Sequence, residues 1–239
     1  MKQISNLIFP AIYYRKSTRS YSDVLVSKAV LDSLQVFING LVPLFPSEKA
    51  AFEIQDHKGA TMKIAAYAED SPASIMNMAF MLQQVDLYLS SIGIGSLWNA
   101  TIRATKSNYQ GLKYRISIVF GIASESPKRT DESQFNRKAL SEISNNQELL
   151  FVKAVQLAPS ARNRQSWYLM CKEKTIDIYF KKENLFDKAL LKNLSWVDIG
   201  IAICHLAVYL LHDGLNPAAA IKTTIQNKTG YNYCISLDY

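Results

Sequence analysis

The sequence predicts an α+β protein built from two related halves. Short segments rich in β-branched and aromatic residues alternate with longer stretches of helical periodicity along the 239 residues. The order helix, strand pair, buried helix occurs twice. We infer an ancient duplication, with residues 1–125 as the first half and 126–239 as the second. Because neither half is expected to bury its long helix alone, the two should pack around a pseudo-twofold axis as one compact pseudo-dimer.

The first half is expected to contain two helices, a strand pair and one further core strand. Apolar residues at helical spacing mark the helices, and β-branched or aromatic runs mark the strands. In chain order we predict a helix over Ser27–Ile38, a hairpin of Ala51–Gln55 and Met62–Tyr67, a long buried helix over Ala73–Ser91, and a strand over Arg115–Gly121.

The second half repeats this order after a polar linker at Ala123–Asn136. Its predicted elements are a helix over Glu148–Leu157, strands over Trp167–Cys171 and Ile176–Phe180, and a buried helix over Asp198–Leu211. Local details repeat as well. The turn after the first buried helix, at Gly93, parallels the turn at Gly214, and residues 43–47 fall where Ala158-Pro159-Ser160 does.

Composition narrows the possible classes of protein. A hydrophobic content of 49% is enough for a substantial core, and the net charge of +7 suits an anionic partner. The basic residues are dispersed, and no block of five or six like charges or DNA-binding motif occurs, so nucleic acid is a weak interpretation. The three cysteines lie far apart, which indicates neither a disulfide framework nor a zinc site and suggests a reducing cytoplasm.

The sequence also gives little reason to expect a membrane or a metal. The N-terminal apolar stretch runs into Arg15 and Lys16 without a small-residue cleavage site. The longest apolar region, Trp196 to Leu211, is shorter than the roughly 20 residues of a membrane span and contains Asp198 and His205. We therefore expect a buried helix, no membrane partner, and a core or interface role for His205 in preference to metal binding.

Two polar segments carry most of the chemical information. Residues 15–19, Arg-Lys-Ser-Thr-Arg, place three cations and two hydroxyls within five residues, a group that can hold a phosphate. Taken alone, a solvated charged turn is the commoner explanation. Residues 158–167 join a helix end to a strand through Pro, Ser, Asn and Gln. That loop could display polar groups to a ligand, or it could be an ordinary capped turn with Trp167 anchored in the core.

Together the two segments resemble the nitroreductase family, with its Arg-Arg-Ser-x-Arg pattern and its Pro-Ser-x-x-Asn-x-Gln-Pro-Trp loop. Residues 82–98 are similar to the family's buried helix followed by Gly-Leu-Gly-x-x-Trp, and residues 135–140 are similar to its Arg-Lys-Pro-Leu segment. The four motifs occur in order and span most of the chain. Ser166, Ala139 and Ala79 depart from the family pattern, where Pro, Pro and Gly are usual.

The resemblance implies the FMN-dependent nitroreductase fold, with a mainly antiparallel central sheet flanked by helices and two buried helices crossing at the pseudo-twofold axis. Ordinary members are homodimers that build each FMN site from both subunits. Here one chain supplies both segments, as in a single-chain, pseudo-dimeric branch of the family. One complete FMN site should survive, because the first half lacks the Asn-x-Gln-x-Trp loop and the second lacks a separate Arg-Ser segment.

Carried over to this sequence, the resemblance assigns roles to nine residues. Arg15 and Arg137 would hold the FMN phosphate, and Lys16 and Ser17 the phosphate and ribityl region. Arg19 would act as the catalytic residue, stabilising the negative charge that hydride transfer leaves near flavin N1 and O2. The remaining predicted contacts are Ser160 and Asn163 from the opposite half, and Gly93 and Gly95, where glycine permits close approach to the ring.

The function implied is NAD(P)H-dependent two-electron reduction of a nitroaromatic, quinone or similar small-molecule acceptor by a ping-pong route. The alternative is a flavin-binding or sensing module without turnover, which the substituted motif positions would favour. A third and weaker hypothesis is salt-sensitive binding of an anionic surface through the net charge of +7.

Overall fold

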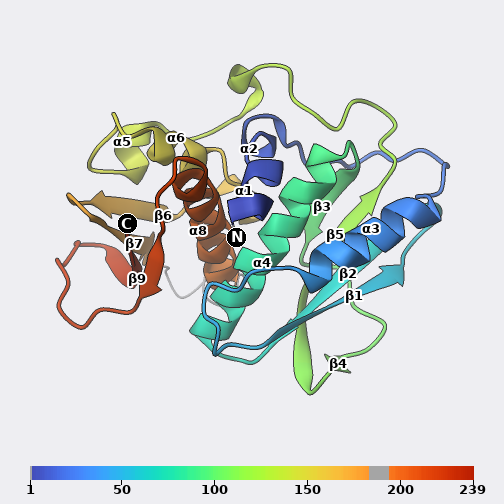
Figure 1. Cartoon of the computed structure of the whole chain (residues 1–239), viewed down its shortest axis with the longest axis horizontal. Coiled ribbons are helices and arrows are strands. Elements are labelled where there is room, and N and C mark those ends of the chain that lie inside the picture. Colours follow the sequence, from blue (N-terminus) through green and yellow to red (C-terminus); the bar gives the residue numbers. More distant parts are fainter. Residues whose placement is uncertain (1, 183–193) are drawn as a thin grey trace.

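The computed structural model describes residues 2–182 and 194–239. Two long helices, α4 (Pro72–Ser91) and α8 (Leu194–His212), pack against each other at the centre, with one antiparallel sheet on either side of the pair (Figure 1). The predicted α+β class, with antiparallel sheets flanked by helices, is confirmed. The single central sheet of the prediction is replaced by two sheets, one in each half, because the helix pair separates them.

The first sheet has the strand order β1-β2-β5-β3, with the short β4 also paired to β5. Its strands are β1 (Ala50–Asp56), β2 (Met62–Ala68), β3 (Gly95–Asn99), β4 (Asn108–Tyr109) and β5 (Leu112–Gly121). The predicted hairpin and core strand correspond to β1, β2 and β5. β3 was not predicted, although its residues had been singled out as a motif. Before this sheet comes α3 (Lys28–Asn39), whose first turn is capped by the Ser27 side chain accepting from Val30 N.

The second sheet has the order β6-β7-β9-β8, which is the same order as the first when equivalent strands are matched. Its strands are β6 (Trp167–Cys171), β7 (Thr175–Lys181), β8 (Ala218–Ala220) and β9 (Tyr231–Asp238). The strand pair β6 and β7 was predicted. β8 and β9 were missed, since no strand was expected after the second buried helix.

Details of the two halves match closely. Gly93 and Gly214 both have positive φ (79° and 85°), and the residue after each donates its N–H to a carbonyl five residues back at 2.9 Å. Both inner strand pairs shift register by one residue at a tyrosine, Tyr67 in β2 and Tyr179 in β7. Each of these tyrosines packs edge-to-face on a tyrosine of the neighbouring strand, at 5.9 and 5.8 Å between ring centroids.

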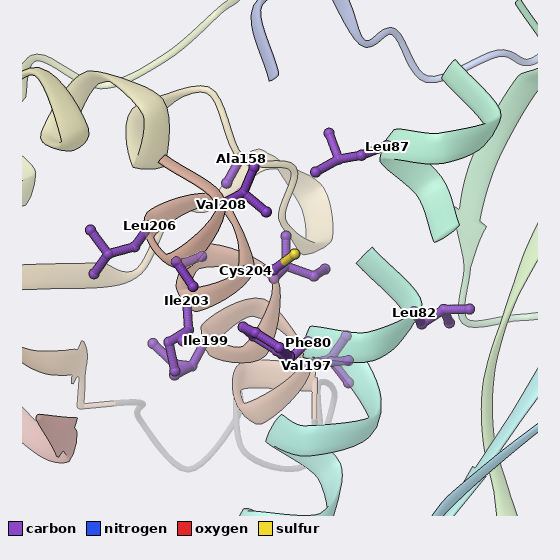
Figure 2. Close-up of a cluster of buried hydrophobic side chains, with 14 of the residues drawn as sticks. Phe80, Leu82, Leu87, Ala158, Val197, Ile199, Ile203, Cys204, Leu206 and Val208 are labelled. Carbon is purple, nitrogen blue, oxygen red and sulfur yellow. The ribbon is translucent and has the colours of Figure 1, made fainter. Parts of the chain in front are cut away.

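The crossing of α4 and α8 is close enough that one position must be glycine. A Cβ on Gly200 would lie 2.4 Å from Met76 O and 2.8 Å from Ala79 Cβ. Ala79, one of the departures from the family pattern, therefore faces a glycine that makes room for its methyl group. Figure 2 shows α8 directing Ile199, Ile203 and Leu206 away from α4, and Val197 and Cys204 toward it.

The remaining helices are short and pack around the central pair. They are α1 (Lys2–Ile8), α2 (Ala11–Tyr14), α5 (Leu140–Ile143), α6 (Leu150–Gln156) and the 3-10 turns η1 (Glu132–Gln134) and η2 (Ala161–Asn163). α1 lies against both α4 and α8. α8 is long and apolar enough to span a membrane by composition alone, with a mean hydropathy of 1.8, but 83% of that stretch is buried inside the protein. The prediction of a buried helix is thus confirmed.

Candidate functional site

A cavity of about 450 Å³ opens where the two halves meet, within the size range of small-molecule and cofactor sites. Residues 15–19 of the first half and the 159–163 loop of the second half both line it. Seven of the nine predicted site residues are among its lining residues: Arg15, Lys16, Ser17, Arg19, Arg137, Ser160 and Asn163. The structure therefore brings together two segments that are far apart in the sequence.

Backbone hydrogen bonds to both neighbours fix the segment at residues 15–19. Thr18 N donates to Ser96 O in β3 at 2.8 Å, and Arg129 N donates to Tyr14 O at 2.8 Å. The guanidinium of Arg129 also donates to Arg15 O. The segment thus lies between β3 and the stretch that the sequence predicted as a linker.

Arg15 is almost fully buried and forms an ion pair with Asp86 of α4. Its Nη2 donates to Ser17 Oγ at 2.8 Å. Asp86 accepts two more hydrogen bonds, from Ser96 Oγ at 2.5 Å and from Gln83 Nε2 at 3.2 Å. A buried carboxylate needs this degree of compensation, and the result is a guanidinium held in one orientation at the cavity wall.

Gln83 links this ion pair to the other half of the protein. Its Oε1 accepts from Trp98 Nε1 at 3.0 Å, and its Nε2 lies 3.1 Å from His205 Nε2 in α8. The Nδ1 of His205 lies 3.0 Å from Ala154 O, which can only accept. His205 is therefore neutral, with its proton on Nδ1 and its Nε2 accepting from Gln83. Burial lowers the pKa of His205 to about 3, in agreement with this assignment. The predicted core or interface role fits this position.

The loop at residues 159–165 adopts an unusual backbone. Arg162, Asn163 and Gln165 have φ of 51°, 56° and 45°, in the left-handed region that non-glycine residues rarely occupy. Several hydrogen bonds hold it there: Gln165 N donates to Ser160 Oγ at 2.9 Å, and Ala161 N donates to Asp198 Oδ1 at 2.8 Å. Strain of this kind, stabilised by its surroundings, is typical of binding sites.

Arg137 connects this loop to the cavity. Its guanidinium donates to Asn163 Oδ1 at 2.8 Å and to Leu157 O at 3.0 Å. Its Nε is buried and has no hydrogen-bond partner among the described residues. Burial, together with Arg15 and Arg129, lowers the pKa of Arg137 to about 10. A partly buried cation with an unsatisfied donor is suited to an anionic ligand group.

Gly93 and Gly95 are the two predicted site residues that do not line the cavity. Gly93 ends α4 with φ 79°. A Cβ on Gly95 would lie 2.8 Å from the side chain of Thr18. The close approach at Gly95 is thus between β3 and the segment at residues 15–19. That the backbone after this turn lies beside the flavin ring remains a prediction. Leu97 and Trp98, which follow the turn, do line the cavity.

Sequence reasoning missed several other lining residues, including Arg129, Arg162 and Asp198. Arg129 lies in the stretch predicted as a polar linker, and acidic residues follow it closely in the sequence. In the structure Glu132 pairs with Lys153 at 2.5 Å, and Asp131 accepts from Ser133 N at 2.7 Å. Among the described residues neither carboxylate forms an ion pair with Arg129, whose guanidinium carbon lies 4.0 Å from the ring centroid of Phe135. The sequence contained no signal for these pairings.

The lining as a whole fits a cofactor that carries a phosphate. Among the described residues, the lining includes one carboxylate residue, Asp198, and six cationic residues: Arg15, Lys16, Arg19, Arg129, Arg137 and Arg162. Trp98, Leu97 and Ile116 provide apolar surface beside them. Guanidinium groups bind phosphate through paired hydrogen bonds, and apolar walls suit a planar ring system.

A second, smaller cavity of about 190 Å³ is also lined by residues of both halves, at positions that correspond to those of the first cavity with the halves exchanged. It is formed by Pro43 and Leu44, by Phe80 of α4 and by Ala219 of β8. The equivalent turns at Gly93 and Gly214 are 121 positions apart. Adding 121 to a position in the first half gives its counterpart in the second, so Phe80 corresponds to Ile201 and Trp98 to Ala219. In the described part of the chain, no lysine or arginine lines this second cavity.

Comparisons with known proteins agree with this geometry. The family model described as putative TM nitroreductase matches residues 7–209. A putative nitroreductase of Thermotoga maritima is 23% identical over 97% of this chain and 93% of that chain, with a TM-score of 0.71. At this identity the similarity shows the fold.

Other solved structures are similar over about half of this chain. An FMN-dependent nitroreductase from Clostridium difficile is 18% identical over 53% of this chain and 93% of that chain, with a TM-score of 0.43. A nitroreductase with bound FMN from Desulfitobacterium hafniense is 12% identical over 56% of this chain and 99% of that chain, with a TM-score of 0.44. No curated protein matched the chain.

Proposed function

Since the chain belongs to the putative TM nitroreductase family, we propose that it is an oxidoreductase that binds FMN in the cavity between its two halves. The observation that carries this proposal is the joint lining of that cavity by the cationic segment at residues 15–19 and the strained loop at 159–165. Neither segment could form the site without the other.

Each half contributes a different part of the proposed binding. Arg137, with its unpartnered Nε, and the neighbouring Arg129 are placed to hold the phosphate. Arg15 donates to Asp86 and to Ser17, so its main contribution is to orient Ser17 and to keep a positive charge beside the phosphate. Lys16 and Ser17 would contact the phosphate and ribityl chain, and Ser160 and Asn163 would approach from the second half.

When bound, FMN supplies two-electron redox chemistry. The overall reaction that we propose transfers a hydride from NADH or NADPH, with one proton from solvent, to a nitroaromatic, quinone or similar acceptor. A quinone becomes the hydroquinone, a nitro group becomes a nitroso group with release of water, and the nicotinamide is oxidised in both cases. Reductant and acceptor would occupy the same space in turn, as in a ping-pong mechanism. Arg19, which is exposed at the cavity lining, would stabilise negative charge on the pyrimidine edge of the flavin.

We further propose that the chain arose by duplication and kept one flavin site. The equal strand orders and the matching helix ends support the duplication. Asn77 and Asp198, which are 121 positions apart, hold equivalent loops: Asn77 Oδ1 accepts from Leu44 N and Phe45 N, and Asp198 Oδ1 accepts from Ala161 N. Among the described residues, no lysine or arginine lines the counterpart cavity, which supports a single site for a phosphate-bearing cofactor.

The test is the absorption spectrum and flavin content of the purified protein after incubation with FMN. We expect one FMN per chain, and bleaching of the flavin band on anaerobic addition of NADH or NADPH. Two bound flavins per chain would contradict the single site. Tight binding without bleaching would replace the enzyme proposal with the flavin-binding or sensing module, and failure to bind FMN would remove the cofactor assignment.

A further inference from the structure

The cavity carries more positive charge than one flavin phosphate can balance. Among the described residues, six cations line the cavity, Arg15 is paired with Asp86, and Asp198 is the one lining carboxylate. A phosphate monoester brings about two negative charges near neutral pH. About two positive charges therefore remain beside the place of the flavin.

The surplus cations have no carboxylate partner in the described part of the chain. The recorded ion pairs of that part join other residues, and none includes Lys16, Arg19, Arg129, Arg137 or Arg162. Arg129 donates to carbonyl oxygens of Arg15 and Gln134, and Arg137 to those of Asn136 and Leu157. These neutral carbonyl oxygens accept hydrogen bonds from the two guanidinium groups but do not neutralise their positive charge.

These cations lie at two depths. Arg137 and Arg129 are partly buried, and burial with arginine neighbours lowers the pKa of both to about 10. Arg19 and Arg162 are exposed, and each comes from a different half of the protein. The inner pair suits a bound phosphate, whereas Arg19 and Arg162 are accessible to a compound that enters from solvent.

Building on the proposed function, we infer that the electron acceptor is an anion, an aromatic compound or quinone bearing a carboxylate, sulfonate or similar group. Such a compound would place its charge against Arg162 and its reducible ring beside Trp98. The step is the hydride transfer described above, with the proton again from solvent. The anionic group contributes to binding and is neither oxidised nor reduced. A surface with surplus charge also raises the rate of encounter with ions of the opposite sign.

The experiment compares two acceptors that differ in charge, 4-nitrobenzoate and 4-nitrobenzamide, as the ratio of their kcat/KM values with the FMN-loaded protein. Intrinsic differences in reactivity cancel when this ratio is compared between variants. The variant is Arg162→Asn, because asparagine tolerates the φ of 51° at this position. Lys174→Gln, in the turn between β6 and β7, removes one positive charge away from the cavity and serves as the matched control.

We expect Arg162→Asn to lower the ratio of anion to neutral acceptor by about fivefold, and Lys174→Gln to leave it unchanged. Raising the salt concentration from about 0.05 to about 0.5 M should lower the wild-type ratio in the same direction. Binding of benzoate and benzamide, which are not reduced, should show the same preference in the flavin absorbance of the loaded protein.

Turnover of both acceptors with a ratio insensitive to salt and to Arg162→Asn would overturn the inference while leaving the flavin enzyme intact. If the protein takes up no FMN, or if NADH and NADPH never reduce the bound flavin, the proposed function itself is wrong. The spectrum recorded before any acceptor is added separates these two failures.

Discussion

Asp86 is a buried residue of α4 whose role the sequence did not predict, although it lies within the motif at residues 82–98. It pairs with Arg15 and accepts from Ser96 and Gln83, so three side chains around the cavity depend on it. Sequence reasoning identified Arg15 as a cofactor ligand but gave no partner for it. A buried guanidinium requires such a carboxylate, and the sequence spacing of 71 residues gives no indication of which one.

Ala139 shows that a departure from a family pattern can have a local reason. The family has proline here, which has no N–H. In this chain Ala139 N donates to Glu142 Oε2 at 3.0 Å and caps the start of α5. The substitution therefore exchanges a rigid residue for a capping hydrogen bond, next to Arg137 and without changing the cavity lining.

Arg137→Gln is expected to weaken FMN binding by roughly 10- to 100-fold, because the variant loses a charged donor aimed at the phosphate. The FMN affinity of Arg137→Lys should lie between those of Arg137→Gln and the wild type, since lysine keeps the charge but lacks the planar guanidinium group. Fluorescence titration with FMN measures this, with Lys174→Gln as the control. An unchanged dissociation constant for Arg137→Gln would place the phosphate elsewhere.

His205 is expected to make the protein less stable as the pH falls from about 6 to 4. Burial lowers its pKa from the ordinary value of 6.5 to about 3 in the folded state, so only the unfolded chain takes up the proton in this range. The free energy of unfolding should fall by about 1.4 kcal/mol per pH unit from this residue alone.

The comparison for this prediction is His205→Asn, whose side-chain amide can still donate to Ala154 O but does not titrate. Urea unfolding at pH 6, 5 and 4 should show a shallower dependence on pH for the variant than for the wild type. Equal slopes would show that His205 does not carry the effect.

At the scale of elements, the crossing of α4 and α8 is the contact that holds the halves together. Helix propensity alone would favour alanine over glycine at position 200 by about 1 kcal/mol. In this protein the packing favours glycine instead. A Cβ at position 200 would lie 2.4 Å from the carbonyl oxygen of Met76, a backbone atom that cannot move aside as a side chain could.

We expect Gly200→Ala to lower the free energy of unfolding by about 2 kcal/mol or more. The control is Gly40→Ala at the end of α3, where the nearest atoms to a new Cβ are 3.6 and 3.7 Å away. Chemical denaturation of both variants should show a large loss for the first and little change for the second. Similar midpoints for the two variants would contradict the close crossing.

The whole molecule is expected to unfold as one unit. Buried apolar side chains of both halves form one continuous cluster across the helix pair, from Leu34 and Ile64 to Ile178 and Ile235. Because α4 and α8 cover each other, exposing one helix also exposes the other.

Tryptophans report on the halves separately, since Trp98 lies in the first and Trp167 and Trp196 lie in the second. One variant would keep only Trp98, and another would replace only Trp98 by phenylalanine. Each variant should give fluorescence and circular dichroism unfolding curves with the same midpoint. A fluorescence midpoint that departs from the circular dichroism midpoint in either variant would show that one half unfolds on its own.

The sequence by itself determined the main local elements, the two buried helices and the two segments that meet at the cavity. These depend on short-range features: apolar periodicity, β-rich runs, helix stops and motif spacing. The glycine turns at 93 and 214 and the predicted strands β1, β2, β5, β6 and β7 were recovered in this way.

Only the tertiary structure decided that the strands form two sheets, that Gly95 faces Thr18, and that Arg129 reaches the cavity. It also placed Asp86, Gln83 and His205 in one buried chain of hydrogen bonds from α4 to α8. The physical reason is that the packing of the two helices determines which buried polar groups become partners, and these partners can be many residues apart in the sequence. Local periodicity shows which face of a helix is buried, but it does not show what that face meets.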